Sequence, residues 1–152
     1  MNLFYLDPDI NKAVNYHCDK HVVKMCLETA QILCTALHRY GIAAPYKPTH
    51  IRHPTVLWAG DSLQHYSWLK EFGLALCLEY TWRYKKSHAS EAVIKSLPTN
   101  PSIRGSDWRE PPQAMPDSYK GSNTVEAYRR FYRGEKLHFS KWTNRPTPLF
   151  ME

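Results

Sequence analysis

Five polar side chains with helical spacing interrupt an otherwise apolar stretch between about residues 19 and 39: Lys20, His21, Lys24, Glu28 and Gln31. Steps of three and four residues place these groups on successive turns of one helix face. A carboxylate, two amines and an imidazole that share one space can perform acid/base or amine chemistry. The same spacing also fits a solvated helix face with one Lys24–Glu28 ion pair, and the pattern alone favours that simpler interpretation.

The elements that must position this stripe are predicted to be helices. Asp7 and Pro8 are typical of the N-cap and first residue of a short helix that ends near Tyr16. Further helices are expected over residues 19–39, from 54 to about 86 with a break at 60–62, over 89–96 after Ser87, and from Asn123 or Thr124 through Trp142 with a kink at Gly134. No segment alternates strongly enough to require a strand, so the predicted fold is an all-α, compact helical bundle with residues 1–152 in a single domain.

Two connecting segments have compositions that separate them from the helices. Residues 42–52 combine proline, tyrosine and threonine with positive charge, which is typical of a basic loop. Residues 97–121 contain five prolines and two glycines, which disfavours regular structure. Because Trp108, Met115 and Tyr119 lie in this second segment, we expect an ordered Pro-rich loop or lid before the C-terminal helix.

The composition favours a soluble protein with anionic partners. The net charge is +6 and the pI is about 9.2, so double-stranded DNA or a nucleotide is the expected partner. No apolar run is long enough for a membrane span, and the acidic N-terminal residues do not resemble a secretory signal. We therefore expect a cytoplasmic monomer with no membrane partner.

Cysteine and histidine spacing does not predict a metal site. The four cysteines lack CxxC spacing and are expected to be reduced and mostly buried. His17 and His21 are spaced like two ligands of a helical zinc site, with Cys18 or Glu28 as candidate third ligands, but the HExxH pattern is absent. Nucleophile-elbow, Walker, Rossmann and deaminase motifs are absent as well, and no cofactor is expected.

The last predicted helix interleaves cations with aromatic residues, a mixture suited to phosphate contact and base stacking. The alternative is that the aromatic side chains pack inward while the cations are solvated. The residues concerned are Arg129, Arg130, Arg133, Lys136 and Lys141, with Tyr128, Phe131, Tyr132, Phe139 and Trp142.

Several motifs in residues 1 to about 88 resemble the pyrimidine-dimer DNA glycosylase (phage endonuclease V) family. They are Met-x-Leu-Phe-x-Leu at the start, Asp19-Lys20-His21 followed by Glu28, and the stretch from His53 to Tyr84, in which Pro-Thr opens a helix with a glycine break. The resemblance implies a divergent phage-type member, acting in the host cytoplasm if phage-encoded. It also implies an all-helical protein that kinks DNA, flips a base and attacks deoxyribose with an N-terminal amine.

The resemblance assigns roles to part of the stripe. Glu28 falls on the family's catalytic glutamate, and His21 on a histidine near it. Leu27 and Gln31 stand where the family has arginines, so the phosphate clamp is weakened or moved to other residues. The candidate DNA contacts are Lys20, Gln31, Arg39, Lys47, Arg52, His53, Arg129, Arg130, Arg133 and Lys136.

Two amines are candidates for the nucleophile. Initiator methionine is normally removed only before a small residue, so Met1 is expected to remain before Asn2 and to carry the free amine. Lys24 is the alternative, one turn from Glu28, and burial or cations such as Lys20 and a protonated His21 would favour its neutral form. An amine that attacks the sugar forms an imine, which permits strand scission, while a carboxylate stabilises the developing positive charge.

The sequence therefore favours a DNA-repair N-glycosylase, with AP-lyase activity as an optional second step, that excises a damaged or modified pyrimidine. Glu28, Lys24, His21 and Met1 are its candidate catalytic residues. Two alternatives stay open: an enzyme of the same scaffold that acts on a modified base or free nucleotide, and a noncatalytic DNA-binding protein. Base displacement would use an apolar or aromatic wedge, for which Trp58, Tyr66, Trp68 and Trp82 are candidates by residue type.

Overall fold

The computed structural model describes residues 1–152 and contains helices and turns but no strand. The helices are α1 (Ile10–Tyr16), α2 (Asp19–Arg39), α3 (Pro54–Asp61), α4 (Leu63–Tyr84), α5 (Ala89–Ser96) and α6 (Thr124–Phe131). A short helical turn at Asp117–Tyr119 precedes α6, and further turns follow it at Tyr132–Lys136, Leu137–Phe139 and Leu149–Met151. The predicted all-α fold is confirmed.

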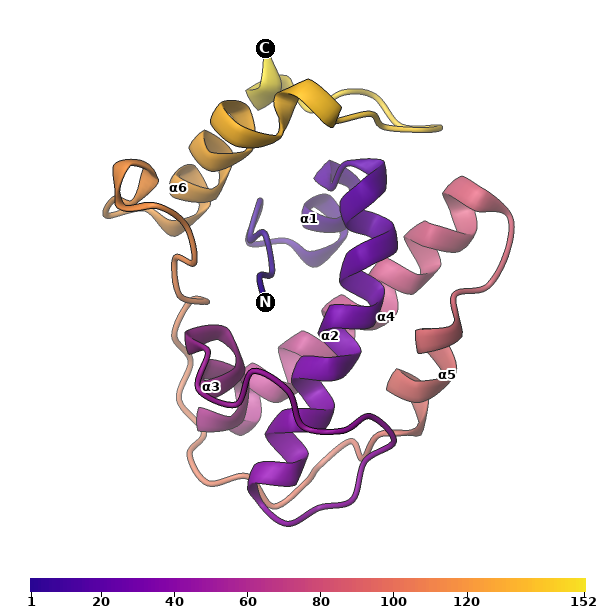
Figure 1. Cartoon of the computed structure of the whole chain (residues 1–152), viewed down its shortest axis with the longest axis vertical. Helices are drawn as coiled ribbons and strands as arrows, with labels where there is room; N and C mark the ends of the chain where they lie inside the picture. Colours follow the sequence, from indigo (N-terminus) through magenta and orange to yellow (C-terminus); the bar gives the residue numbers. More distant parts are fainter.

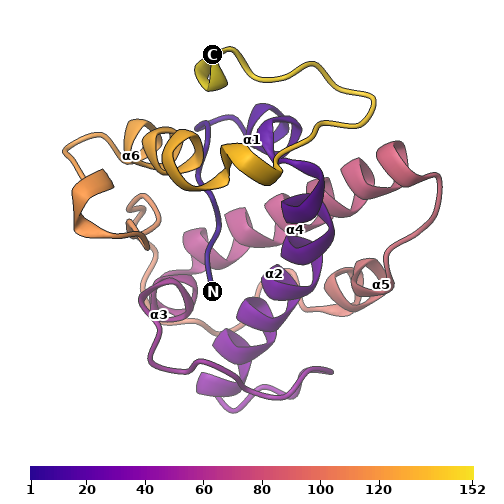
Figure 2. The same cartoon turned by 45° about the horizontal axis from the view of Figure 1, so that its top comes forward.

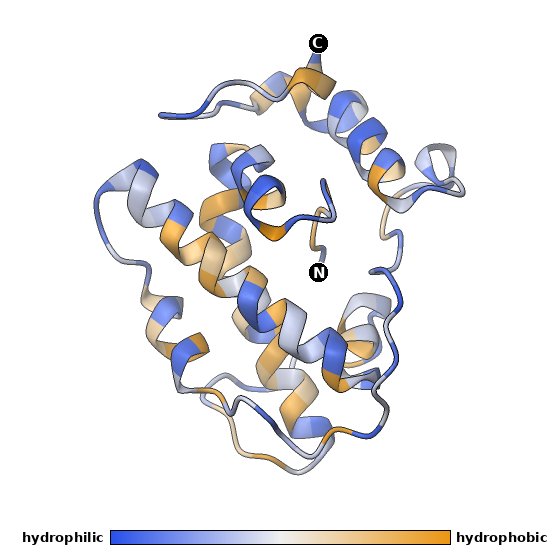
Figure 3. Ribbon diagram, turned by 180° about the vertical axis from the view of Figure 1, so that it is seen from behind, coloured by the Kyte–Doolittle hydropathy of each residue, from blue (hydrophilic) through white to orange (hydrophobic).

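The two long helices, α2 and α4, cross and pack against each other in the middle of the molecule (Figure 1). A hydrophobic cluster of 30 buried residues draws its members from Leu3 to Met151. Orange and blue residues alternate along the helices in Figure 3, as expected when each helix buries one face and exposes the other. Helix α6 and the C-terminal turns cover the end of the bundle where the N-terminal segment enters.

Helix boundaries agree with the sequence prediction where one side chain acts as a cap. Ser62 ends α3 and begins α4, and its hydroxyl accepts a hydrogen bond from the Gln64 amide at 3.2 Å, so the predicted break is confirmed. Asp9 rather than Asp7 caps α1, because the Asp9 carboxylate accepts from the Lys12 amide at 2.9 Å. The cap of α5 is His88, not Ser87.

The last helix is shorter than predicted. Regular α-helix ends at Phe131, and the chain continues through the wider π turn Tyr132–Lys136 and a tight turn at Leu137–Phe139. A side chain at Gly134 would collide with the Tyr119 hydroxyl, so glycine permits close contact between this turn and the Pro-rich segment. The prediction of one helix through Trp142 was therefore wrong.

The Pro-rich segment is ordered and lies along α3, α4 and the N-terminal segment. The Trp58 indole donates to the Arg109 carbonyl at 2.8 Å, the Arg109 amide donates to His65 at 2.9 Å, and the Tyr66 hydroxyl donates to the Pro98 carbonyl at 2.7 Å. These contacts hold the segment at several points along its length. No helix of the protein combines the length and the apolar character needed to cross a membrane.

Candidate active site

The N-terminal segment runs into the interior of the protein. Leu3, Phe4, Tyr5 and Leu6 are all buried, and the chain passes beneath α6 so that its N-terminus points toward α2 and α3 (Figure 2). Phe4 adopts a left-handed backbone conformation, with φ of 52°, which costs a residue other than glycine about 1–3 kcal/mol. The surrounding contacts must therefore determine this conformation.

Two amines face the Glu28 carboxylate on α2. The Met1 α-amine lies 3.9 Å from Oε1, and the Lys24 ammonium lies 3.5 Å from Oε2. The Met1 side chain is only 2% exposed, whereas the Lys24 side chain is 61% exposed. The carboxylate thus lies between the amine of a buried residue and the amine of an exposed, flexible side chain.

The Glu28 carboxylate is not saturated by hydrogen bonds. Its Oε2 atom is buried without a hydrogen-bond partner, and both amines lie beyond the usual 2.7–2.9 Å of a charge-assisted hydrogen bond. A buried carboxylate oxygen that lacks a partner is costly, so such groups are expected mainly at functional sites. The arrangement leaves Glu28 free to accept or return a proton.

His53, which directly follows the basic loop, lies near enough to the site for the charge of the Met1 amine to affect it. The His53 imidazole caps α3 by accepting from the Thr55 amide at 3.1 Å. Burial lowers the pKa of His53, and the positive charge of the Met1 amine lowers it further. The loop is also tied to α2, because the Thr49 amide donates to the Thr35 hydroxyl at 3.1 Å. Met1, Lys24 and Glu28 therefore come together, and the loop that leads to His53 is anchored on the same helix as Glu28.

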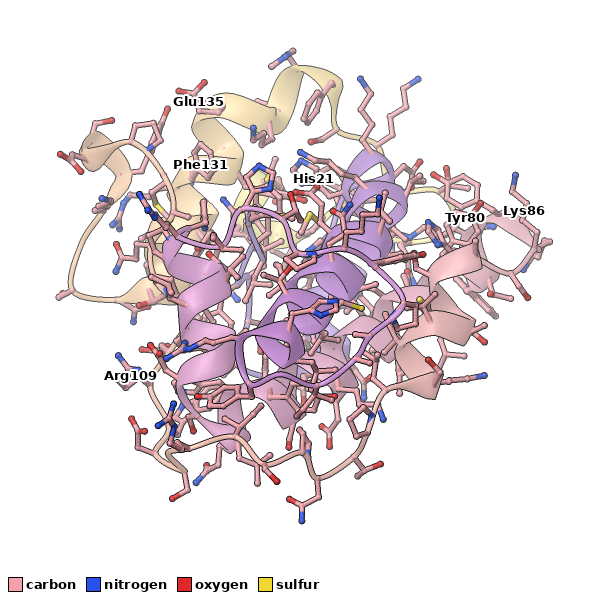
Figure 4. The ribbon with its side chains drawn as sticks, turned by 60° about the horizontal axis from the view of Figure 1, so that its bottom comes forward. His21, Tyr80, Lys86, Arg109, Phe131 and Glu135 are labelled. Atoms are coloured by element: carbon pink, nitrogen blue, oxygen red, sulfur yellow. The ribbon has the colours of Figure 1, made fainter.

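His21 does not join this group, although the spacing places it on the stripe. Its ring is buried, stacks on Phe4 with ring centroids 4.0 Å apart, and lies 2.6 Å from the Tyr132 hydroxyl. Figure 4 shows His21 on the side of the molecule that carries Phe131 and Glu135. Burial lowers the pKa of His21 to about 2, so the expected protonated imidazole beside Lys24 was wrong.

Three arginines proposed for DNA contact hold the chain together instead. Arg129 donates to the Leu6 carbonyl at 2.9 Å, and lies 3.0 Å from the Asp7 carboxylate. Arg130 donates to the Tyr119 carbonyl at 2.9 Å, and Arg133 donates to a C-terminal carbonyl at 3.0 Å. Tyr128, Phe131 and Tyr132 are buried, so inward packing, rather than base stacking, describes these aromatic residues.

The remaining candidates for DNA contact differ in whether they already have a partner within the protein. Arg39 pairs with Asp61 at 2.9 Å, and Lys136 lies over the Phe131 ring at 4.9 Å. Gln31 is half-buried on α2, one turn beyond Glu28. The exposed cations are Lys20 and Lys24 on α2 and Lys47 and Arg52 on the loop.

Leu27 is an exposed apolar side chain next to the site. It is 41% exposed and directly precedes Glu28 on α2. Of the aromatic wedge candidates, Trp58 and Tyr66 are buried, and Trp68 stacks on another core ring. Trp82 is exposed at the far end of α4, beside Lys85.

A cavity of about 440 Å³ lies on the same side of α2 as Glu28. Thr35 and His38, two to three turns beyond Glu28, form one wall, while Pro48, Ile51 and Leu57 form another. The lining is mixed. The loop and α3 contribute apolar side chains, whereas α2 contributes mainly polar ones. No group of three or more His, Cys, Asp or Glu side chains is arranged to hold a metal ion.

The sequence did not identify Asn2 as part of the site. Its side chain bonds to the Ala114 carbonyl at 2.7 Å, across 112 residues of sequence. No local pattern indicates such a contact, although asparagine is a frequent residue in turns that use the side chain as an acceptor.

The fold and the site together define a class of protein: an all-helical chain that brings an α-amine and a lysine close to one glutamate. A family model described as pyrimidine dimer DNA glycosylase matches residues 1–92, more than half of the 152 residues. The chain belongs to this family of DNA-repair glycosylases, whose substrate is DNA. No curated protein and no solved structure matches the chain.

Proposed function

We propose that the protein is a DNA glycosylase with AP-lyase activity, in which the Met1 α-amine is the nucleophile and Glu28 transfers protons. The observation that carries this proposal is the distance of 3.9 Å between the Met1 amine and Glu28 Oε1, beside a carboxylate oxygen without a hydrogen-bond partner. The substrate is duplex DNA with a damaged or modified pyrimidine, in agreement with the family.

The chemistry needs one amine and one carboxylate. The neutral amine forms a bond to C1′ of the deoxyribose while the C1′–N bond breaks and its electron pair leaves with the base. Glu28 takes the proton lost by the amine and delivers it to O4′ as the C1′–O4′ bond opens, which leaves an iminium. Removal of a C2′ proton by Glu28 then expels the 3′ phosphate and cuts the strand.

Met1 is favoured over Lys24 by its fixed position. Its side chain is nearly buried, and the following residues are held by the core, so little motion is lost when the amine reacts. Lys24 is mostly exposed and has a flexible stem. In this proposal Lys24 pairs with the Oε2 atom of Glu28 and also contacts a phosphate.

The DNA-facing surface is proposed to be the exposed face of α2 with the basic loop. Lys20, Lys24, Lys47 and Arg52 supply exposed positive charge there, and among them Lys24 also pairs with Glu28. Leu27 lies among them and can enter the base stack as an apolar wedge, which helps offset the few kcal/mol that base displacement costs. The cavity beyond Glu28 offers space for a displaced base.

The test is reductive trapping with borohydride on duplexes that carry either a pyrimidine dimer or an abasic site. Borohydride converts the imine into a stable amine, and peptide mass analysis locates the linked residue. We expect the link at Met1, after intact mass has established that Met1 carries a free amine. A duplex without damage is the control, and absence of any adduct on both damaged duplexes would contradict the proposal.

Two variants separate the amines. Extending the chain by two residues before Met1 displaces the amine by up to about 7 Å and should abolish trapping. Lys24→Met should still form the adduct. If the adduct maps to Lys24, or the extended chain traps at the original rate, the nucleophile is not Met1.

Salt distinguishes DNA binding from nucleotide binding. A protein that contacts several phosphates loses duplex affinity steeply as salt rises, whereas affinity for a single nucleotide changes little. We expect the steep dependence for this protein. Duplex binding without any product would instead favour a noncatalytic DNA-binding protein.

A further inference from the structure

The side chain of Asn2 fixes the residue next to the proposed nucleophile. Its Oδ1 accepts hydrogen bonds from the Leu3 amide at 2.7 Å and the Phe4 amide at 2.9 Å. Its Nδ2 donates to the Ala114 carbonyl at 2.7 Å. One amide side chain therefore shapes the turn that precedes the buried segment and also ties that turn to a distant part of the chain.

The carbonyl that Asn2 uses is itself held in place by α6. The Ala114 amide donates to the Tyr128 hydroxyl at 3.2 Å, and the same hydroxyl donates to the Pro112 carbonyl at 2.5 Å. Tyr128 is fully buried. A continuous series of hydrogen bonds thus runs from α6 through the Pro-rich segment to Asn2.

A second anchor lies two residues beyond Asn2. The Phe4 ring stacks on His21 and meets the Tyr132 ring edge-on, with centroids 5.5 Å apart. Tyr132 directly follows α6, so both anchors of the N-terminal segment come from the same end of the molecule. The two anchors hold the Leu3 and Phe4 amides and the Phe4 ring, so the backbone of residues 2–4 has little freedom. This restricts the positions that the Met1 amine can occupy.

These partners lie outside the part of the chain that defines the family. The family match ends at residue 92, whereas Pro112, Ala114 and Tyr128 follow it. We infer that Asn2 is a positioning residue, through which the Pro-rich segment holds the Met1 α-amine against Glu28. This inference rests on the proposed role of Met1 as the nucleophile.

The inference predicts a loss of reaction rate without a loss of DNA affinity. Asn2 contacts the chain rather than the proposed DNA-facing surface, so its replacement should alter the position of the amine and leave binding unchanged. Asn2→Asp keeps an oxygen for the Leu3 and Phe4 amides but loses the donor to Ala114. Asp, like Asn, is not a small residue, so Met1 should remain.

The experiment measures single-turnover trapping on an abasic-site duplex together with the dissociation constant for the same duplex. We expect Asn2→Asp to trap at least 10-fold more slowly, with a dissociation constant within twofold of the original. Tyr128→Phe should slow trapping in the same direction, and the double variant should be no slower than the slower single variant because both act through one contact.

A matched control is Tyr66→Phe. It removes another buried tyrosine hydroxyl that holds the Pro-rich segment, here at Pro98 and away from Asn2. This variant should trap at close to the original rate. If Tyr66→Phe and Tyr128→Phe slow trapping equally, the segment acts only as general support and the inference is wrong.

The outcomes separate the two proposals. If the original protein forms no adduct at Met1, the proposed function fails and the positioning role fails with it. If the adduct forms but Asn2→Asp traps at an unchanged rate, or loses DNA affinity in proportion to rate, the positioning role alone is wrong. Should Asn2→Asp fail to fold, Asn2→Gln and Tyr128→Phe provide the same comparison.

Discussion

Two glutamates in this protein each face two cationic groups, but only one of them forms direct hydrogen bonds with both. Glu79 on α4 is buried and lies 2.8 Å from both Arg83 and Arg145, each through a direct hydrogen bond. Glu28 on α2 has its nearest cations at 3.5 and 3.9 Å, and one of its oxygens has no hydrogen-bond partner. The same charges therefore form a saturated structural cluster in one place and an unsaturated site in the other.

The Glu79 cluster joins distant parts of the chain. Arg83 also contacts Asp19 at the start of α2 at 3.0 Å, and Asp19 accepts a hydrogen bond from the Thr143 amide at 2.9 Å. Burial alone would raise the pKa of Glu79, but the hydrogen bonds from Arg145 and Arg83 outweigh burial and lower it. A carboxylate so strongly held stabilises the fold and has no capacity left for a substrate.

The sharpest test of this comparison is Glu28→Gln. We expect base excision and trapping to fall by about 10²–10⁴-fold, because proton transfer is lost while the shape of the side chain is kept. The free energy of unfolding should change little, since the lost ion pairs are long. Thermal unfolding of the same preparation is the check, and an undiminished adduct would show that Glu28 is not the catalytic acid.

Glu79→Gln should have the opposite effect. Removing one charge leaves Arg83 buried with reduced compensation, and such changes cost about 3–5 kcal/mol in the free energy of unfolding. Denaturant unfolding measures this loss. Glu91→Gln is the matched control, because Glu91 forms an i,i+4 pair with the exposed Lys95 whose loss should change the free energy of unfolding very little.

As the pH falls from 7, the free energy of unfolding should respond first to the buried histidines and only at lower pH to the glutamates. Burial lowers the pKa of His17 to about 4 and of His21 to about 2, both from 6.5. The unfolded chain therefore binds protons first, so stability is complete above about pH 6.5 and falls below it, by up to about 2 kcal/mol for each histidine at pH 5. Denaturant unfolding at pH 7 and 5 tests this, and His21→Gln should reduce the dependence.

The contribution of Glu79 to the free energy of unfolding should be lost at a lower pH than that of the histidines. Its folded-state pKa lies below the usual 4.5, so this stability is present above that value and disappears as the pH falls through the lowered pKa. Glu79→Gln should remove this second, more acidic phase while leaving the histidine phase. A single phase unchanged by the substitution would contradict the assignment.

The smallest effect is expected for Lys24→Met. The exposed pair with Glu28 contributes about 0.3 kcal/mol, and trapping should fall by less than about 10-fold. Loss of one phosphate contact should also reduce the slope of log affinity against log salt by about 1. Complete loss of trapping would instead identify Lys24 as the nucleophile.

The sequence predicted features that depend on neighbouring residues. The apolar period of α2 and the Ser62 cap of α4 are local signals, and both helices formed as expected. The Lys24–Glu28 pair follows from i,i+4 spacing alone. Helical spacing could not show which members of the stripe α6 would bury, and His21 was misjudged for that reason.

The features that the sequence did not predict depend on distant residues. The contact between Asn2 and Ala114 and the pair between Glu79 and Arg145 each join segments that no short pattern relates. The early end of α6 has a similar cause, because Tyr119 packs against the backbone at Gly134. In each case tertiary packing, rather than local propensity, determined the outcome.

The buried N-terminal segment has a consequence for the order of folding. Its partners are separated from it by 112 residues at Asn2 and 123 residues at Leu6, so they leave the ribosome long after it does. Contacts of such long range form slowly and late. A growing chain should therefore carry the Met1 amine without an organised carboxylate beside it until α6 has been synthesised.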